Sequence, residues 1–294
     1  MMNKSTIPYL RIIGKLYPDN KLELRPSYLI DRPRRQKEDP KGQVRAELFD
    51  EKGKILLKYK LSTKYYLVDN SKIPKLAVRG EIPFPSNTST IKFYRDDVEL
   101  YELPVPKGKP NVNITWNPPK IVKGKQTITW KGTHSIKDQP IQYFLRYTHD
   151  NGKTWQRVGW RTIETKHEID FDQLPGGKTC KIAIVATDGV NTVIEESSAF
   201  TVPVKPCQAF ILEPKDGAEF HTDQTIVFRG QGYFLEERIA ETKDLVWQSS
   251  LDNKLGSGML LEVPKLTSGT HEILLIAGKG DRAGKAMIKI KIKK

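Results

Sequence analysis

An acid, a glycine and an aromatic residue that together suit a tight turn lie in the stretch Tyr147–Trp155, whose sequence is YTHDNGKTW. Asp150 can accept hydrogen bonds from backbone N–H groups across a turn, and Gly152 can adopt a positive φ. Trp155 can pack beneath the corner that results. None of these roles is catalytic, so the spacing predicts a structural hairpin turn built on Asp150, Gly152 and Trp155.

This stretch also resembles the Asp-box, the S-x-D-x-G-x-T-W pattern that recurs in the propeller blades of sialidases and related glycan-handling proteins. Four of its five fixed positions match, and Thr148 stands where serine is usual. In those families the box is a fold-stabilising turn, repeated in several blades and remote from the catalytic residues. The chain holds one good copy of the pattern, and a second segment, Ser249–Gly258, matches it only weakly. The resemblance therefore implies a turn and not an enzyme.

Other arrangements that support catalysis are missing from the sequence. Glu195 and Glu196 are adjacent, so on a strand they would point to opposite faces instead of pairing across a sugar. The segment Leu255–Met259, LGSGM, lacks the spacing of a G-x-S-x-G elbow. The histidines are scattered, without an H-E-x-x-H or comparable metal-ligand pair: His134, His149, His167, His221 and His271. No phosphate-cradling glycine loop precedes a helix, and we expect no catalytic residues and no enzyme.

Acidic residues in the last third offer oxygen ligands of the kind that calcium prefers. These acids are Asp216, Glu219, Asp223, Glu236, Glu237, Glu241 and Asp244. Lysine and arginine side chains lie among them and oppose the binding of a cation. The sequence therefore predicts no metal and no cofactor, with calcium as the alternative.

The densest charged feature is the run Asp31–Gln43, DRPRRQKEDPKGQ. Guanidinium and ammonium groups suit phosphate or sulfate, which makes four residues candidates for ligand binding: Arg32, Arg34, Arg35 and Lys37. Three acids interrupt the run and two prolines bracket it, so an exposed loop is the first interpretation. No aromatic motif of the RNA-binding kind lies nearby, and we do not expect a nucleic acid as the partner.

Two of the five tryptophans are candidates for a binding surface. Trp130 and Trp247 fall within strand patterns and are expected in the core. Trp116 lies near a proline-rich joint, and Trp160 lies at the end of a strand. If exposed, either could stack on a sugar ring or anchor a protein partner. The alternative is that both seal contacts between domains.

Proline-rich joints at Leu103–Pro119 and Phe200–Pro214 divide the chain into three parts. Each part consists of short runs rich in β-branched and aromatic residues, separated by turn residues, as in antiparallel sandwiches. Asp50 and Gly53 indicate a hairpin within the first part. We predict an all-β chain with three consecutive β-sandwich domains in an elongated arrangement: a basic domain at 1–109, a second at 110–204 and a third at 205–294.

The second domain resembles fibronectin type III-like modules. The resemblance rests on a tryptophan on an early strand in TITWKG, on the central strand QYFLRYT, and on a late strand that ends in ATDG. The third resembles the immunoglobulin-like or PKD-like modules of bacterial surface proteins, in the segments LVWQSS and LTSGTHEI. Such modules occur mostly in exported proteins, so the resemblance implies an extracellular or cell-surface location. The amino terminus shows no secretory signal, which leaves the cytoplasm as the alternative.

The net charge of the chain is +14, of which residues 1–109 contribute +9. Such a surface favours acidic partners of any kind. Cys180 and Cys207 are too few for a disulfide framework; Cys180 is expected to be a small buried hydrophobe, and a bridge to Cys207 is the alternative. No apolar run is long enough to span a membrane.

Taken together, these features predict a non-catalytic binding or spacer protein that presents loops and sheet edges to a protein or polysaccharide partner. Two alternatives stay open: an accessory region of a secreted hydrolase, and an intracellular binder of polyanions. The sequence specifies neither the ligand nor the oligomeric state.

Overall fold

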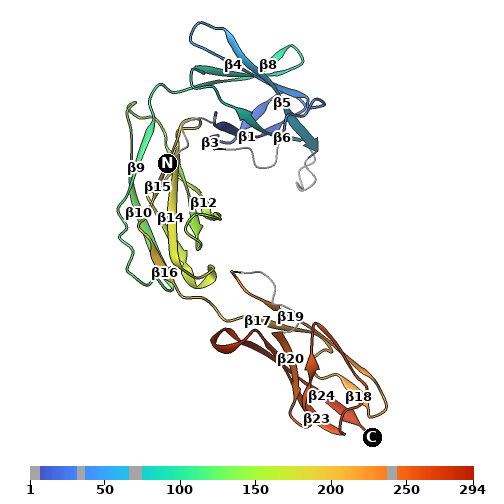
Figure 1. Ribbon diagram of the computed structural model, residues 1–294. Coiled ribbons are helices and arrows are strands. Elements are labelled where there is room, and N and C mark those ends of the chain that lie inside the picture. Colours follow the sequence, from blue (N-terminus) through green and yellow to red (C-terminus); the bar gives the residue numbers. More distant parts are fainter. Residues whose placement is uncertain (1–6, 32–36, 66–74, 237–243) are drawn as a thin grey trace.

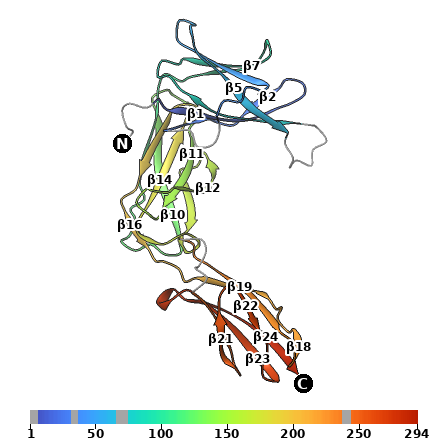
Figure 2. The same cartoon turned by 45° about the vertical axis from the view of Figure 1, so that its right-hand side comes forward.

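The computed structural model of the 294-residue chain describes residues 7–31, 37–65, 75–236 and 244–294. Figures 1 and 2 show three β-rich modules that follow one another along an elongated molecule. We call them the N-terminal module (7–109), the middle module (110–204) and the C-terminal module (205–294). The all-β class and the series of sandwiches are thereby confirmed. In the described part of the chain no helix is long and apolar enough to cross a membrane.

The N-terminal module is a single sheet that folds over its own core. Its strands are β1 Tyr9–Leu16, β2 Leu22–Leu24, β3 Tyr28–Ile30, β4 Val44–Phe49, β5 Ile55–Tyr65, β6 Leu76–Pro83, β7 Thr90–Arg95 and β8 Val98–Pro104. The order is β2-β1-β6-β5-β4-β7-β8, with β3 beside β1. One buried cluster holds side chains from both halves of this sheet, for example Leu10, Ile12, Leu48 and Ile91.

The two layers of the N-terminal module share β5, a detail that the prediction of a simple sandwich did not contain. The first part of β5, Ile55–Leu61, pairs with β4, and the last part, Ser62–Tyr65, pairs with β6. At the point where β5 passes from one layer to the other, Leu61 lies close to Gly80 of β6. A Cβ atom at position 80 would lie 2.1 Å from a methyl group of Leu61, so the close approach requires glycine there. The predicted β4–β5 hairpin is confirmed, with Gly53 at a φ of 76° and the Asp50 carboxylate accepting from the Lys52 and Lys54 N–H groups.

The middle module is a two-sheet sandwich. Its strands are β9 Pro110–Ile114, β10 Lys125–His134, β11 Gln142–Thr148, β12 Gln156–Thr162, β13 Lys166–Asp170, β14 Gly177–Thr187, β15 Thr192–Glu196 and β16 Phe200–Val202. One sheet has the order β13-β10-β9, and the other has the order β12-β11-β14-β15, with β16 beside β14. Alternate residues of β11 and β14, such as Leu145, Tyr147 and Ile184, fill the core between the sheets together with Trp130.

The C-terminal module is a second two-sheet sandwich. Its strands are β17 Gln208–Glu213, β18 Glu219–His221, β19 Ile226–Tyr233, β20 Leu245–Ser249, β21 Asn253–Ser257, β22 Leu260–Val263, β23 Gly269–Ala277 and β24 Gly284–Lys293. The sheets have the orders β17-β19-β22 and β18-β24-β23-β20-β21, and β18 runs parallel to β24. Trp247 is fully buried in this core, as predicted, and donates a 2.9 Å hydrogen bond to the Gly258 carbonyl.

The N-terminal and middle modules share a continuous buried junction. Tyr28 and Ile30 of β3 pack on Phe144 and Val185, which lie on the outer face of the five-stranded sheet of the middle module. Val190, at the tip of the β14–β15 hairpin, is fully buried in the core of the N-terminal module.

Hydrogen bonds between backbone and side chains join the same junction. The Thr187 hydroxyl donates to the Ser27 carbonyl at 2.8 Å, and the Leu29 N–H donates to the Thr192 hydroxyl at 2.9 Å. Apolar burial and these hydrogen bonds together indicate that these two modules form one stiff unit.

The middle and C-terminal modules meet through a smaller polar contact. The carboxylate of Glu236 accepts from the Gly176 N–H at 2.7 Å and from the Arg282 guanidinium at 2.9 Å. The Arg282 guanidinium lies 4.4 Å from the centre of the Phe234 ring. Cys180 and Cys207 lie buried in different cores, and both are free thiols, so they do not form a bridge.

Candidate functional site

The Asp150 turn connects β11 to β12 and is closed by its own side chains. The Asp150 carboxylate accepts from the Thr148 hydroxyl at 2.7 Å, from the Thr154 N–H at 2.9 Å and from the Thr154 hydroxyl at 2.6 Å. Gly152 has a φ of 86°, which favours glycine. Partial burial alone would raise the pKa of Asp150, but the hydrogen bonds from Thr154 and Thr148 outweigh it and hold the pKa at about 2.

Trp155 follows this turn and is half-buried. Its indole edge lies in ordinary contact distance of Gly152, about 3.5 Å from the position a Cβ would take there. Trp155 therefore lies against the turn, and it also lines a surface groove.

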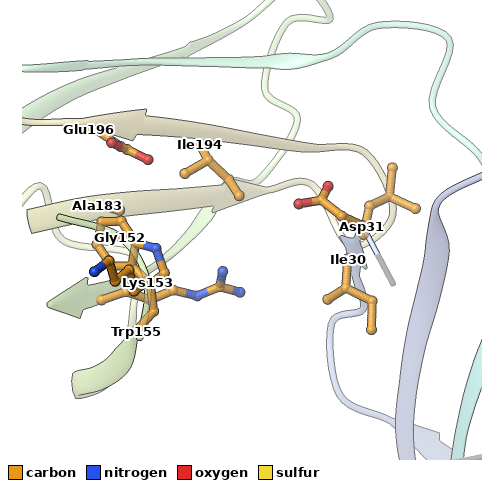
Figure 3. Close-up of a pocket in the computed structure, with 10 residues that line it drawn as sticks. Ile30, Asp31, Gly152, Lys153, Trp155, Ala183, Ile194 and Glu196 are labelled. Atoms are coloured by element: carbon orange, nitrogen blue, oxygen red, sulfur yellow. The ribbon is translucent and has the colours of Figure 1, made fainter. Parts of the chain in front are cut away.

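The groove lies on the outer face of the five-stranded sheet of the middle module, between β3 and the Asp150 turn. Its volume is about 760 Å³. Figure 3 shows Gly152, Lys153 and Trp155 gathered at one end and Ile30 and Asp31 at the other. The full lining is Leu29, Ile30, Asp31, Arg146, Gly152, Lys153, Trp155, Ala183, Ile194 and Glu196. Two modules therefore contribute to one concave surface.

The floor of the groove continues a row of side chains that crosses the sheet. Arg157 of β12 lies opposite Arg146 of β11, which lies opposite Ala183 of β14, which lies opposite Glu196 of β15. The alternate residues of these strands face the core, so the row faces outward. Ala183 is the small member of the row and is itself buried. Glu196 also forms an ion pair with Lys181 at 3.2 Å.

Arginine side chains surround the aromatic contact between the modules. The Tyr28 and Phe144 rings meet edge to face, with centroids 5.0 Å apart. The guanidinium groups of Arg146, Arg157 and Arg161 lie 5.3, 4.9 and 5.7 Å from the centre of the Phe144 ring. These are distances at which cation–π attraction operates.

Charge repulsion adds to burial at two of these arginines. Burial lowers the pKa of Arg161, and the neighbouring Arg157 and Arg25 lower it further. Burial likewise lowers the pKa of Arg157, and Arg25 adds to the effect. A positively charged cluster therefore adjoins the Arg146 end of the groove.

Of the predicted ligand-binding residues that the structure describes, Trp116, Trp160 and Lys37 do not line the groove. Trp116 packs on Phe171 and Phe200, with ring centroids 6.2 and 5.4 Å away, so it belongs to the packing of the middle module. The alternative was that Trp116 seals a contact between domains, but these aromatic contacts lie within one module. Trp160 is 87% exposed near the end of β12.

The basic run is only partly described. Lys37 is exposed, whereas Arg32, Arg34 and Arg35 lie outside the described residues. Asp31, which precedes them in the chain, lines the groove. The sequence offered Trp155 only as a turn residue; its place in the groove depends on β3, more than 120 residues away in the chain.

A serine, a histidine and an aspartate come together in the C-terminal module, an arrangement that sequence spacing did not indicate. The Ser249 hydroxyl lies 2.7 Å from Nδ1 of His271, and Oδ2 of Asp252 lies 3.6 Å from the same nitrogen. His271 is fully buried, and its Nε2 lies 2.6 Å from the Thr267 carbonyl. Ser249 and His271 are both buried, and the same ring nitrogen faces the serine and the aspartate, so this group ties β20 to β23.

Several of the acids that were considered as calcium ligands instead contact groups of the protein itself. Glu219 pairs with Lys293, Asp244 pairs with Lys279 at 2.8 Å, and Asp216 accepts from the Lys289 N–H at 2.7 Å. Glu237 and Glu241 lie outside the described residues. Among the residues that the structure describes, no group of three or more histidine, cysteine, aspartate or glutamate side chains is arranged to hold a metal ion.

Comparisons with known proteins give similarity at the level of fold. No family model and no curated protein matches the chain. The solved structures similar to it are fibronectin type III-like and immunoglobulin domains. The fibronectin(III)-like modules of Clostridium thermocellum CbhA are 16% identical, with a TM-score of 0.26, and the match covers 62% of this chain and 94% of theirs.

Two further solved structures contain tandem domains. A chain of the complex between Dpr2 Ig1–Ig2 and DIP-Theta Ig1–Ig3 is 12% identical with a TM-score of 0.32, and the match covers 87% of this chain and 91% of that one. The three fibronectin domains of chicken CNTN1 are 11% identical with a TM-score of 0.22, and the match covers 87% of this chain and 97% of that one. The predicted resemblance to tandem fibronectin type III-like and immunoglobulin-like modules therefore reappears among solved structures, while the fold class itself follows from the strand order described above.

Proposed function

We propose that this chain is a non-catalytic, multi-domain binding protein that presents a surface groove and sheet edges to a protein or a polysaccharide. The observation that carries the proposal is the groove itself, which is built from two modules held together by a buried junction. A preformed concave surface loses little conformational freedom when a ligand binds, so it suits recognition. The C-terminal module, which in the described part of the chain meets the middle module through the polar contacts of Glu236, then serves as a spacer.

The chemistry of the groove supports binding more than turnover. Trp155 offers an aromatic surface, the exposed Ile194 side chain offers an apolar surface, and charged groups of both signs surround them. Glu196 forms an ion pair with Lys181 at 3.2 Å, so its carboxylate is already engaged within the fold. As part of the proposal we place the protein outside the cell or at its surface, where sandwich modules of these kinds are common.

A matched pair of tryptophan variants tests this function. The intact chain is applied to an array of immobilised glycans and to extracts of its native source, and the retained ligands are identified. We expect Trp155→Ala to abolish retention and Trp160→Ala, an exposed tryptophan outside the groove lining, to leave it unchanged. The same glycans and captured proteins are then incubated with the intact chain. Release of sugar or peptide products would refute the non-catalytic function, and loss of binding in Trp160→Ala alone would move the site to the edge of β12.

A further inference from the structure

The row Arg157–Arg146–Ala183–Glu196 has an unequal distribution of charge. Neighbouring strands lie about 4.8 Å apart, so the row extends about 14 Å across the sheet. Cations occupy one end of it. At the other end Lys181 balances Glu196, so the carboxylate there adds little negative charge.

Positive charge accumulates beyond the Arg157 end. Arg25 and Arg157 are exposed, and Arg161 is half-buried beside them. Within the described residues none of these three guanidinium groups has a carboxylate within ion-pair distance; Arg161 donates to the Pro26 carbonyl instead. Burial lowers the pKa values of Arg157 and Arg161, and repulsion by the neighbouring arginines lowers them further. An anion bound here would relieve that repulsion.

The groove beside this cluster provides contacts of a different kind. The half-exposed Trp155 ring and the Ile194 side chain offer surfaces against which the C–H face of a sugar ring can pack. Asp31 and Lys153 offer an acceptor and a donor for hydroxyl groups at the margins. A ligand that fills both regions needs an anionic group next to uncharged, hydroxyl-rich surface.

We propose that the arginine cluster and the groove together bind an acidic oligosaccharide, with a carboxylate or sulfate on Arg157 and a neighbouring sugar ring on Trp155. In an acidic saccharide, charged sugar units can alternate with uncharged ones. One anionic group can then lie on the arginine cluster while the neighbouring uncharged ring lies in the groove. A nucleic acid carries a phosphate at every step, and Asp31 would face that chain. This inference rests on the proposed binding function and specifies its ligand class.

The experiment measures affinities of the intact chain for four probes by isothermal titration calorimetry. The probes are a galacturonic acid hexamer, a heparin-derived hexasaccharide, neutral cellohexaose and a single-stranded DNA hexamer. We expect at least one of the two acidic saccharides to bind at least about tenfold more tightly than cellohexaose and the DNA, because a charge-assisted contact supplies a factor of about ten or more. Which of the two binds better separates carboxylate from sulfate recognition.

Variants locate the binding. Arg157→Ala is expected to weaken the acidic saccharide about tenfold to a hundredfold, and Trp155→Ala about tenfold. Lys254→Ala removes an exposed charge from the C-terminal module and is expected to change affinity less than about twofold, since it lies far from the row. Hydrogen-exchange protection of the β11–β12 amides verifies that the Arg157 and Trp155 variants retain the fold.

Several results would overturn the inference. Equal binding of cellohexaose, or tighter binding of the DNA, would contradict the ligand class. An equal loss in Arg157→Ala and Lys254→Ala would show attraction by net charge alone. If cellohexaose binds and only Trp155→Ala abolishes it, the acidic ligand is wrong while the binding function stands, whereas cleavage of any probe would contradict the binding function itself.

Discussion

Replacing Asp150 by asparagine is expected to destabilise the middle module at neutral pH and to have little effect in strong acid. The carboxylate accepts three hydrogen bonds, from the Thr148 hydroxyl and from two groups of Thr154, at 2.6 to 2.9 Å. An asparagine at this position keeps one oxygen and turns an N–H₂ group toward at least one of these donors. The variant therefore removes the charge and part of the bonding without changing the shape of the side chain.

The magnitude follows from the pKa of Asp150, which is held at about 2 against an ordinary value of 3.8. This difference corresponds to about 2.4 kcal/mol if it is realised in full. The turn is partly exposed, and solvent screening reduces the effect to about 1–2 kcal/mol. Because the pKa is lower in the folded state, the stabilisation is complete above about pH 4 and is lost as the pH falls through about 2.

Urea unfolding of the intact chain at pH 7, 4 and 2.5 measures this effect, followed through backbone amide signals of the middle module so that its transition is separated from the others. Asp138→Asn is the control. Asp138 is an exposed aspartate of the same module with a φ of 59°, which asparagine also adopts, and we expect its replacement to change stability by less than about 0.5 kcal/mol. A difference between wild type and Asp150→Asn that is as large at pH 2.5 as at pH 7, or absent at pH 7, would refute the reasoning.

Three further variants probe the junction, the C-terminal core and the surface. Tyr28→Ala removes the ring that packs on Phe144 at 5.0 Å and should weaken the junction by about 2–3 kcal/mol, so that a shared calorimetric transition of the first two modules splits; an unsplit transition would contradict the stiff unit. Trp247→Phe leaves a cavity and an unpaired Gly258 carbonyl, and urea titration should show a loss of about 2–3 kcal/mol in the C-terminal module alone. Trp160→Ala, at a side chain 87% exposed, should change the unfolding free energy by less than about 0.5 kcal/mol, and a larger loss would show that it packs in the fold.

Local features were predictable from the sequence because the residues that create them are neighbours in the chain. Asp50 and Gly53 close the β4–β5 hairpin through contacts within four residues. The Asp150 network likewise spans Thr148 to Thr154. Turn chemistry of this kind depends on side-chain length and backbone freedom, both of which the sequence states directly.

Features formed by distant segments were not predictable in this way. The sharing of β5 between two layers depends on Gly80 meeting Leu61, and nothing in the alternation of β5 marks that crossing. Trp116 and Trp160 both lie near the ends of strand patterns, yet one is packed on phenylalanines and the other is exposed. The groove requires β3 to lie on the middle module, and that placement comes from long-range packing.

The burial of Val190 in the N-terminal core has a consequence for the order in which the chain acquires its structure during synthesis. The N-terminal module leaves the ribosome first, but its hydrophobic core gains its last side chain only when the β14–β15 hairpin has formed, some 80 residues after Lys109. Until then, the site that receives Val190 stays open to solvent. The N-terminal module is therefore completed by the middle module, so the two modules reach their final form as a pair.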